Sequence, residues 1–122
     1  RTLARAEALV QLFAPVAGET RLAVCGFEQP RTAFDLIING TSASLQGDLP
    51  PLSPEVIGEN TVVYDMMYSL QTTTFNQWAL EQGAQTVYDG LGMLVEQAAE
   101  SFRIWRRVSP ATRPVIEELR ND

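Results

Sequence analysis

The chain has 122 residues, 45% of them hydrophobic, which allows one domain with one modest core. Its formal net charge of −6 argues against a nucleic-acid-binding protein, which would normally carry a basic face, and no apolar run approaches the roughly 18 residues of a membrane span. The chain has no Lys and no His, which excludes a His-activated nucleophile, a Lys Schiff base and a His-containing zinc site.

The first predicted element is an amphipathic helix over residues 2–14, which Pro15 ends. Arg1 and Arg5 flank its first turn, where the helix dipole disfavours positive charge. An anion held between the two guanidinium groups and the free amides of that turn would explain them. The alternative interpretation is a pair of solvated surface arginines.

Four short segments with the composition of β-strands follow, at residues 21–27, 35–39, 61–66 and 85–88. Their apolar runs are continuous rather than alternating, which is typical of parallel strands covered on both faces. Cys25 lies in the first of them, so we expect a buried, unreactive thiol. A single cysteine forms no intrachain disulfide, no signal peptide is visible, and we expect a cytoplasmic protein.

Helical patterns separate and follow the strands. Residues 53–57 predict one turn of helix, residues 75–82 a helix with Gly83 as its C-terminal cap, and residues 91–107 the longest helix. A last helix is predicted over residues 110–120, with Ser109 as its cap. The order of elements predicts an α/β fold with a doubly wound parallel sheet of about four strands and helices on both faces.

Three groups of residues lie where ligands bind in such sheets, outside the carboxyl ends of the strands. Residues 39–42 (Asn-Gly-Thr-Ser) offer small polar groups, and residues 64–68 (Tyr-Asp-Met-Met-Tyr) offer an apolar wall with a polar tip. In residues 89–97, two glycines permit close backbone approach, and Gln97 places an amide beside apolar neighbours. Ordinary turns, core packing and a surface Gln are the alternative interpretations of these groups.

The order of these motifs closely resembles the C-terminal part of the shikimate dehydrogenases, over nearly all of the chain. The resemblance is carried by Arg-Thr-x-x-Arg (1–5), Asp-Leu-Ile-Ile-Asn-x-Thr-Ser (35–42), Tyr-Asp-Met-x-Tyr (64–68) and Asp-Gly-Leu-Gly-Met-Leu-Val-x-Gln-Ala-Ala (89–99). These enzymes use NADPH to reduce 3-dehydroshikimate to shikimate in aromatic amino-acid biosynthesis. The resemblance therefore implies NADP as cofactor and a partial Rossmann-like sheet that lacks the first two strands.

The resemblance also implies a role for particular residues. Arg1, Thr2 and Arg5 would grip the 2′-phosphate of NADP, and Tyr68 and Gln97 would contact the substrate. The other implied cofactor contacts are Thr41, Ser42, Met66, Gly90, Met93 and Leu94. The whole of residues 1–122 would be the C-terminal portion of the NADP-binding domain, with residues 91–120 as closing helices. Gly40 and Thr74 stand where the family commonly has Ala and Pro.

The family's catalytic Lys-Asp pair, its Ser-x-Ser substrate motif and its glycine-rich loop lie upstream of the segment that this chain resembles. We therefore expect no catalytic residue and no metal ligand in this chain, and no dehydrogenase activity from the chain alone. Its partner would be the N-terminal half of the enzyme. Without it, the strand at residues 21–27 has no neighbour, so we expect strand exchange, dimerisation or a rearranged N-terminal portion.

Two alternatives remain open. A quinate or dual quinate/shikimate dehydrogenase has the same fold, but the NAD-preferring forms usually carry an acid where Arg1 stands. A non-catalytic module that retains the scaffold needs neither Tyr68 nor Gln97. The upstream coding sequence would distinguish these alternatives.

Overall fold

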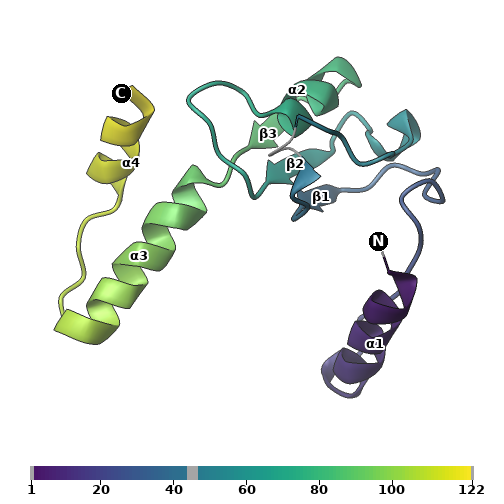
Figure 1. Cartoon of the computed structure of the whole chain (residues 1–122), viewed down its shortest axis with the longest axis horizontal. Helices are drawn as coiled ribbons and strands as arrows, with labels where there is room; N and C mark the ends of the chain where they lie inside the picture. Colours follow the sequence, from purple (N-terminus) through teal and green to yellow (C-terminus); the bar gives the residue numbers. More distant parts are fainter. Residues whose placement is uncertain (1, 44–46, 122) are drawn as a thin grey trace.

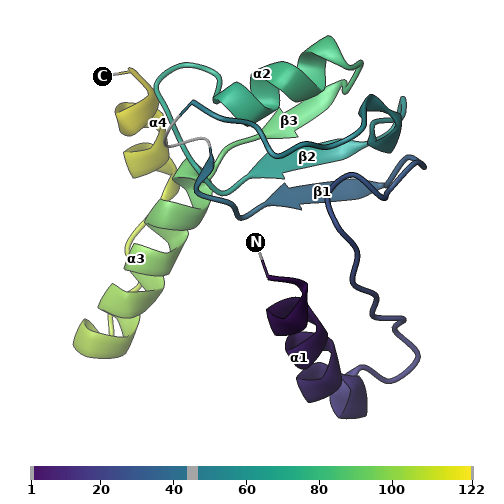
Figure 2. The same ribbon diagram turned by 45° about the vertical axis from the view of Figure 1, so that its right-hand side comes forward.

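The computed structural model describes residues 2–43 and 47–121, which form an α/β fold with a three-stranded parallel sheet. Figures 1 and 2 show α2 beside the sheet, α3 running away from it, and α1 standing apart near the N-terminus. In chain order, the elements are α1 (Leu3–Phe13), η1 (Ala14–Val16), β1 (Leu36–Asn39), η3 (Pro54–Val56), β2 (Val62–Asp65), α2 (Thr74–Glu81), β3 (Thr86–Tyr88), α3 (Leu91–Arg106) and α4 (Arg113–Asn121).

The sheet has the order β1-β2-β3, and both pairs of neighbours are parallel. Asn39 at the end of β1 pairs with Asp65 at the end of β2, so the carboxyl ends of these strands meet at one edge. The chain then enters α3 directly after β3, at this same edge. The sheet therefore gathers the predicted strand-end motifs on one side of the molecule, as the sequence predicts.

The core lies between the sheet and α2. Val63, Phe75, Ala79 and Ala84 form its buried centre, and the Phe75 and Trp78 rings pack with centroids 5.4 Å apart. The Thr73 hydroxyl caps α2 by accepting a hydrogen bond from the backbone N–H of Asn76 at 3.3 Å. Gly83, with φ of 102°, ends the helix in the left-handed region, as predicted.

The prediction of a strand at residues 21–27 is wrong. Residues 21–26 have no regular structure, and the Cys25 side chain is exposed rather than buried. An apolar run becomes a strand only when a neighbour supplies its hydrogen bonds, and no described strand lies at the free edge of β1. The described sheet therefore has three strands instead of about four.

The expectation of helices on both faces of the sheet is also not met by the described elements. α2 covers the face that carries Val63, whereas Leu36, Ile38 and Tyr88 are 53%, 59% and 57% exposed. Successive residues of a strand point to opposite faces, which explains why Ile37 is packed on the core while its two neighbours are not. The second face is apolar and open.

The closing helix α4 begins at Arg113, three residues later than predicted. Pro114 rather than Pro110 occupies its first turn, where the missing N–H costs little. The Thr112 hydroxyl donates to Glu96 Oε1 at 2.7 Å and so fastens the start of α4 to α3. Among the described residues, no helix is long and apolar enough to cross a membrane.

Candidate functional site

A buried polar network occupies the ends of β1 and β2. The Asn39 amide donates to Asp65 Oδ1 at 3.0 Å, and both residues are at most 4% exposed. The carbonyl oxygen of the same amide accepts from the Thr41 backbone N–H at 3.1 Å and from its hydroxyl at 2.8 Å. Asp65 Oδ1 also accepts from the Met67 N–H at 3.2 Å. The two strand-end motifs are therefore one hydrogen-bonded unit.

Met66 and Gly90 meet at this edge. The Gly90 N–H donates to the Met67 carbonyl at 2.9 Å, and a Cβ atom on Gly90 would overlap the Met66 carbonyl oxygen. Gly40 lies on the other side of Met66, since a Cβ atom there would stand 3.2 Å from the Met66 sulfur. The start of α3 thus abuts the end of β2, and the half-exposed Met66 side chain lies beside Gly40.

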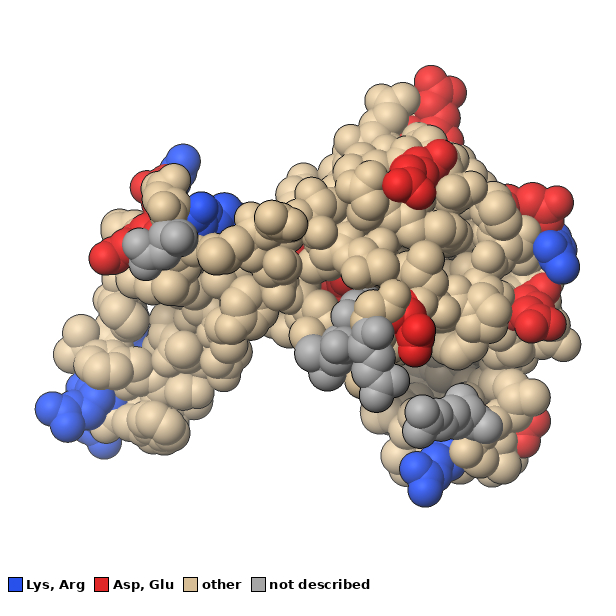
Figure 3. Space-filling model, turned by 45° about the horizontal axis from the view of Figure 1, so that its top comes forward, with Lys and Arg blue, Asp and Glu red and all other residues tan. Residues whose placement is uncertain are grey.

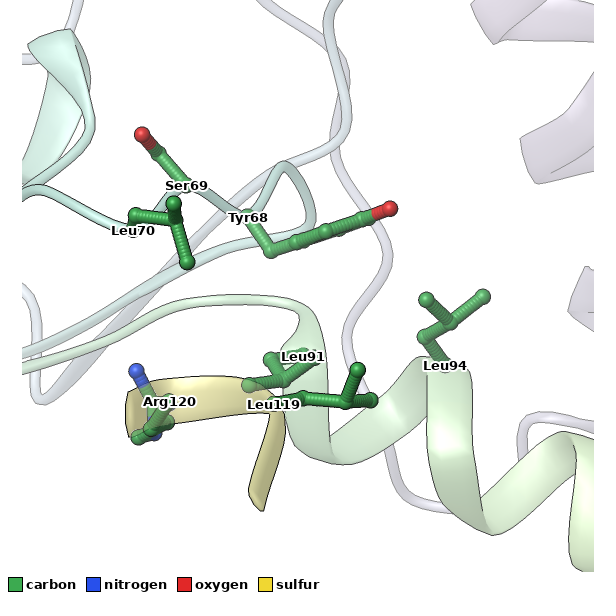
Figure 4. Close-up of a pocket in the computed structure, with 7 residues that line it drawn as sticks. All are labelled: Tyr68, Ser69, Leu70, Leu91, Leu94, Leu119 and Arg120. Carbon is green, nitrogen blue, oxygen red and sulfur yellow. The ribbon is translucent and has the colours of Figure 1, made fainter. Parts of the chain in front are cut away.

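An apolar hollow of about 340 Å³ lies between the residues that follow β2 and the helices α3 and α4. Figure 4 shows the Tyr68 ring across from Leu91 and Leu119, with its hydroxyl directed away from Arg120. Leu94 lies on the side toward which that hydroxyl points. The structure therefore brings together one predicted substrate contact, Tyr68, and one predicted cofactor contact, Leu94.

Thr41 and Ser42 line a second hollow, of about 470 Å³, with the segment that leads to Pro51. Its wall is partly apolar, because Phe27 and Leu49 contribute to it together with Asp48. The two hydroxyl-bearing residues at the strand end are therefore accessible to a ligand from this side.

The predicted phosphate-binding residues lie at the start of α1. Thr2 is the N-cap of α1 without a side-chain capping bond, and Arg5 is exposed. Arg1 lies outside the described residues. Both ribbon views show α1 separated from the sheet (Figures 1 and 2), so the structure does not bring Thr2 and Arg5 to the strand-end motifs.

Met93 and Gln97 lie on α3 and are both exposed. The Gln97 amide donates to the Leu94 carbonyl of its own helix at 2.8 Å. It is not among the residues that line the hollow beside Tyr68. The structure therefore places the two predicted substrate contacts near the same helix but does not join them.

The sequence does not predict the contact between Asp89 and Arg120. Asp89, whose side chain is 10% exposed, accepts from both terminal nitrogens of Arg120 at 2.7 and 3.1 Å. Asp89 Oδ1 also accepts from the Leu91 N–H at 3.2 Å. The hydrogen bond to Asp89 raises the pKa of Arg120 above its ordinary value. No short-range pattern reveals a pair of residues 31 positions apart.

The charged side chains are unevenly distributed over the face drawn in Figure 3. Acidic side chains are dispersed over the part that carries the sheet, and the face drawn in Figure 3 has no continuous basic surface among its described residues. Among the residues that the structure describes, no group of three or more acidic or cysteine side chains is placed to hold a metal ion.

Known proteins are similar to this chain over part or all of its length. Residues 90–120 match the family described as Shikimate 5′-dehydrogenase C-terminal domain. Over all 122 residues, the chain is 66% identical to a protein from Marinobacter nauticus named Shikimate dehydrogenase (NADP(+)). The chain is therefore similar to the C-terminal part of proteins named shikimate dehydrogenase. A relative of the same name from Alkalilimnicola ehrlichii is 54% identical over 98% of the chain. The chain spans 44% and 43% of the lengths of these two dehydrogenases.

Solved structures support the relationship to shikimate dehydrogenases and the partial Rossmann-like fold. An Ael1 enzyme from Pseudomonas putida matches 98% of the chain with a TM-score of 0.76 and 37% identity, and the match covers 43% of that enzyme. A shikimate dehydrogenase in complex with NADP+ matches 71% of the chain with a TM-score of 0.57 and 34% identity, and the match covers 30% of that protein.

Proposed function

We propose that residues 1–122 form the C-terminal portion of the NADP-binding domain of a shikimate dehydrogenase, and that they supply the cofactor side of its active site. The contact of Gly90 with the backbone of Met66 carries this proposal, because it fixes the start of α3 at the carboxyl edge of the sheet. Similarity over the full chain to relatives named for NADP(+) supports it.

The residues at this edge suit a dinucleotide that has both polar and apolar parts. The side chains of Met66, Met93 and Leu94 are 43%, 40% and 38% exposed and provide apolar surface for an aromatic ring. Thr41 and Ser42 provide hydroxyl donors at the end of β1. Thr2 and Arg5, with Arg1, would bind the 2′-phosphate once α1 lies beside this edge.

The bound cofactor would supply the hydride, and this chain would supply orientation. Tyr68 offers a phenolic hydroxyl next to the apolar hollow, and Gln97 offers an amide on α3. Both groups suit a substrate rich in hydroxyl groups, such as shikimate. The Gln97 amide donates one N–H to the Leu94 carbonyl, which leaves its second N–H and its oxygen for a substrate hydroxyl.

The resemblance to the shikimate dehydrogenases places the Lys-Asp pair that transfers the proton upstream of these residues, and this chain contains no Lys. We therefore propose that the chain alone does not oxidise shikimate, and that another part of a longer protein supplies the acid–base group. The sharpest test is a chimera in which residues 1–122 replace the matching segment of the Marinobacter nauticus dehydrogenase.

The chimera and the purified 122-residue chain are assayed for shikimate-dependent reduction of NADP. We expect activity from the chimera and none from the chain alone. A folded chimera that reduces NAD with quinate but not NADP with shikimate would instead identify a quinate dehydrogenase. A folded chimera without any activity would favour a non-catalytic module and would overturn the proposal.

We also propose that the chain alone associates with itself. No described strand pairs with the outer edge of β1, and the open face of the sheet presents the apolar side chains of Leu36 and Ile38. Sedimentation of the purified chain should give a mass above that of the monomer, with a concentration-dependent melting temperature. A monomer that melts cooperatively would contradict this.

A further inference from the structure

The Asp89–Arg120 ion pair connects two places that the proposed function needs together. Asp89 lies between β3 and Gly90, and its carboxylate caps the start of α3 through the Leu91 N–H. Arg120 lies near the end of α4 and places both terminal nitrogens on the same carboxylate. The pair therefore connects the last turn of the closing helix to the junction that sets the position of Gly90.

The rest of α4 is held weakly by packing. None of its residues is buried, and Leu119, which faces the hollow in Figure 4, remains 39% exposed. Among the residues that the structure describes, a second polar contact, between Thr112 and Glu96, lies at the opposite end of α4. A bidentate ion pair with a nearly buried carboxylate is thus the principal attachment at the C-terminal end of α4.

The end of α4 that this ion pair holds also forms one wall of the hollow beside Tyr68. Arg120 and Leu119 come from α4, Leu91 and Leu94 from α3, and Tyr68 from the segment after β2. If α4 moved away, the hollow would lose one side, and the Tyr68 ring would keep Leu91 opposite it but lose Leu119 (Figure 4). The width of this hollow therefore depends on the ion pair.

We propose that Asp89 and Arg120 are positioning residues: their ion pair holds α4 in place and thereby sets Gly90 and Tyr68 for cofactor and substrate. This inference rests on the proposed function. The 2′-phosphate grip lies at the other end of the chain, so loss of the pair should leave binding of NADP largely intact. Orientation at the reacting end should suffer, because small displacements there are costly in rate.

The test uses the chimera with Asp89→Asn, Arg120→Gln and Arg120→Lys. For the first two variants, we expect kcat to fall about five- to tenfold and KM for shikimate to rise about threefold, with KM for NADP within about twofold of the parent. Arg120→Lys should recover part of the loss, because Lys retains the charge but not the bidentate geometry.

The matched control is Arg113→Gln. It removes the same charge from the same helix and breaks the exposed pair with Glu117, which lies within α4 and joins no other element. Its kinetic constants should match those of the parent. If Arg113→Gln reduced kcat as much as Arg120→Gln, the effect would come from general loss of charge on α4, and the inference would be wrong.

Hydrogen exchange of the 122-residue chain tests the pair independently of activity. Amides of residues 113–121 should exchange about fivefold faster in Asp89→Asn and Arg120→Gln but not in Arg113→Gln. Unchanged exchange in the first two variants would overturn the inference even if the chimera were active. If the parent chimera were inactive but the exchange pattern were as expected, the proposed function would be wrong. The ion pair would then be shown to hold α4 in place, without a role in catalysis.

Discussion

Gly90 lies so close to Met66 that a Cβ atom on it would stand 2.7 Å from the Met66 carbonyl carbon. Gly90 has φ of −79°, a conformation that any residue adopts, so glycine is required here for space and not for backbone freedom. The contact brings the first turn of α3 against the end of β2. A side chain at position 90 would therefore separate the two elements at the proposed cofactor edge.

Gly90→Ala should destabilise the chain by about 1–3 kcal/mol, as overpacking generally does. In the chimera, it should also weaken NADP binding, because α3 must shift. Gly92→Ala is the matched control: a Cβ atom there meets nothing within 4 Å, and Ala favours the helix by up to about 1 kcal/mol. Urea unfolding measures the change in stability, and titration with NADP measures the change in affinity. Equal stability of the two variants would show that the Gly90 contact is not tight.

Asn39→Ala should cost about 1–3 kcal/mol, because it leaves the buried Asp65 carboxylate and the Thr41 loop without their shared partner. Thr41→Val is the control, since it removes only the hydroxyl bond at 2.8 Å and should cost about 1 kcal/mol or less. Urea unfolding of both variants checks that Asn39→Ala loses more stability than Thr41→Val. If Asn39→Ala unfolded at the same urea concentration as the parent, the network would contribute nothing to stability.

Much of the fold can be predicted from the sequence, because the strongest signals are local. The continuous apolar run at residues 61–66 predicts β2 within one residue at each end, and the helical pattern before Gly83 does the same for α2. The segment 21–27 has an equally good strand composition but forms no strand. Whether an apolar run pairs depends on a neighbour, and composition contains no information about neighbours.

The candidate site also has one part that the sequence predicts and one part that it does not. The strand-end rule predicts that Thr41, Met66 and Gly90 share one edge, since parallel strands end together. The Asp89–Arg120 ion pair could not be predicted, because the position of α4 depends on tertiary packing and not on spacing along the chain. The late start of α4 at Arg113 is a second example, since two prolines compete for its first turn.

Gln97→Ala and Tyr68→Phe should each raise KM for shikimate about three- to tenfold in the chimera, because each removes one hydrogen bond to the substrate. KM for NADP should change little. Gln77→Ala is the control: Gln77 is another exposed amide, and its side chain donates to Glu81 within α2. An unchanged KM for shikimate in Gln97→Ala would show that this amide does not bind the substrate.

Arg120→Lys should make the attachment of α4 sensitive to alkaline pH. The hydrogen bond to Asp89 raises the pKa of Arg120, so its stabilising contribution is complete below the ordinary Arg value and persists through pH 11. A lysine has an ordinary pKa of about 10.4, which the same carboxylate would raise, so its contribution is complete below about pH 10.4 and is lost as pH rises through the raised pKa. The melting temperature of Arg120→Lys relative to the parent should therefore begin to fall above about pH 10.4. Arg113→Lys, in the exposed pair with Glu117, should show a smaller fall. Equal falls would mean that Asp89 binds Arg120 no more strongly than Glu117 binds Arg113.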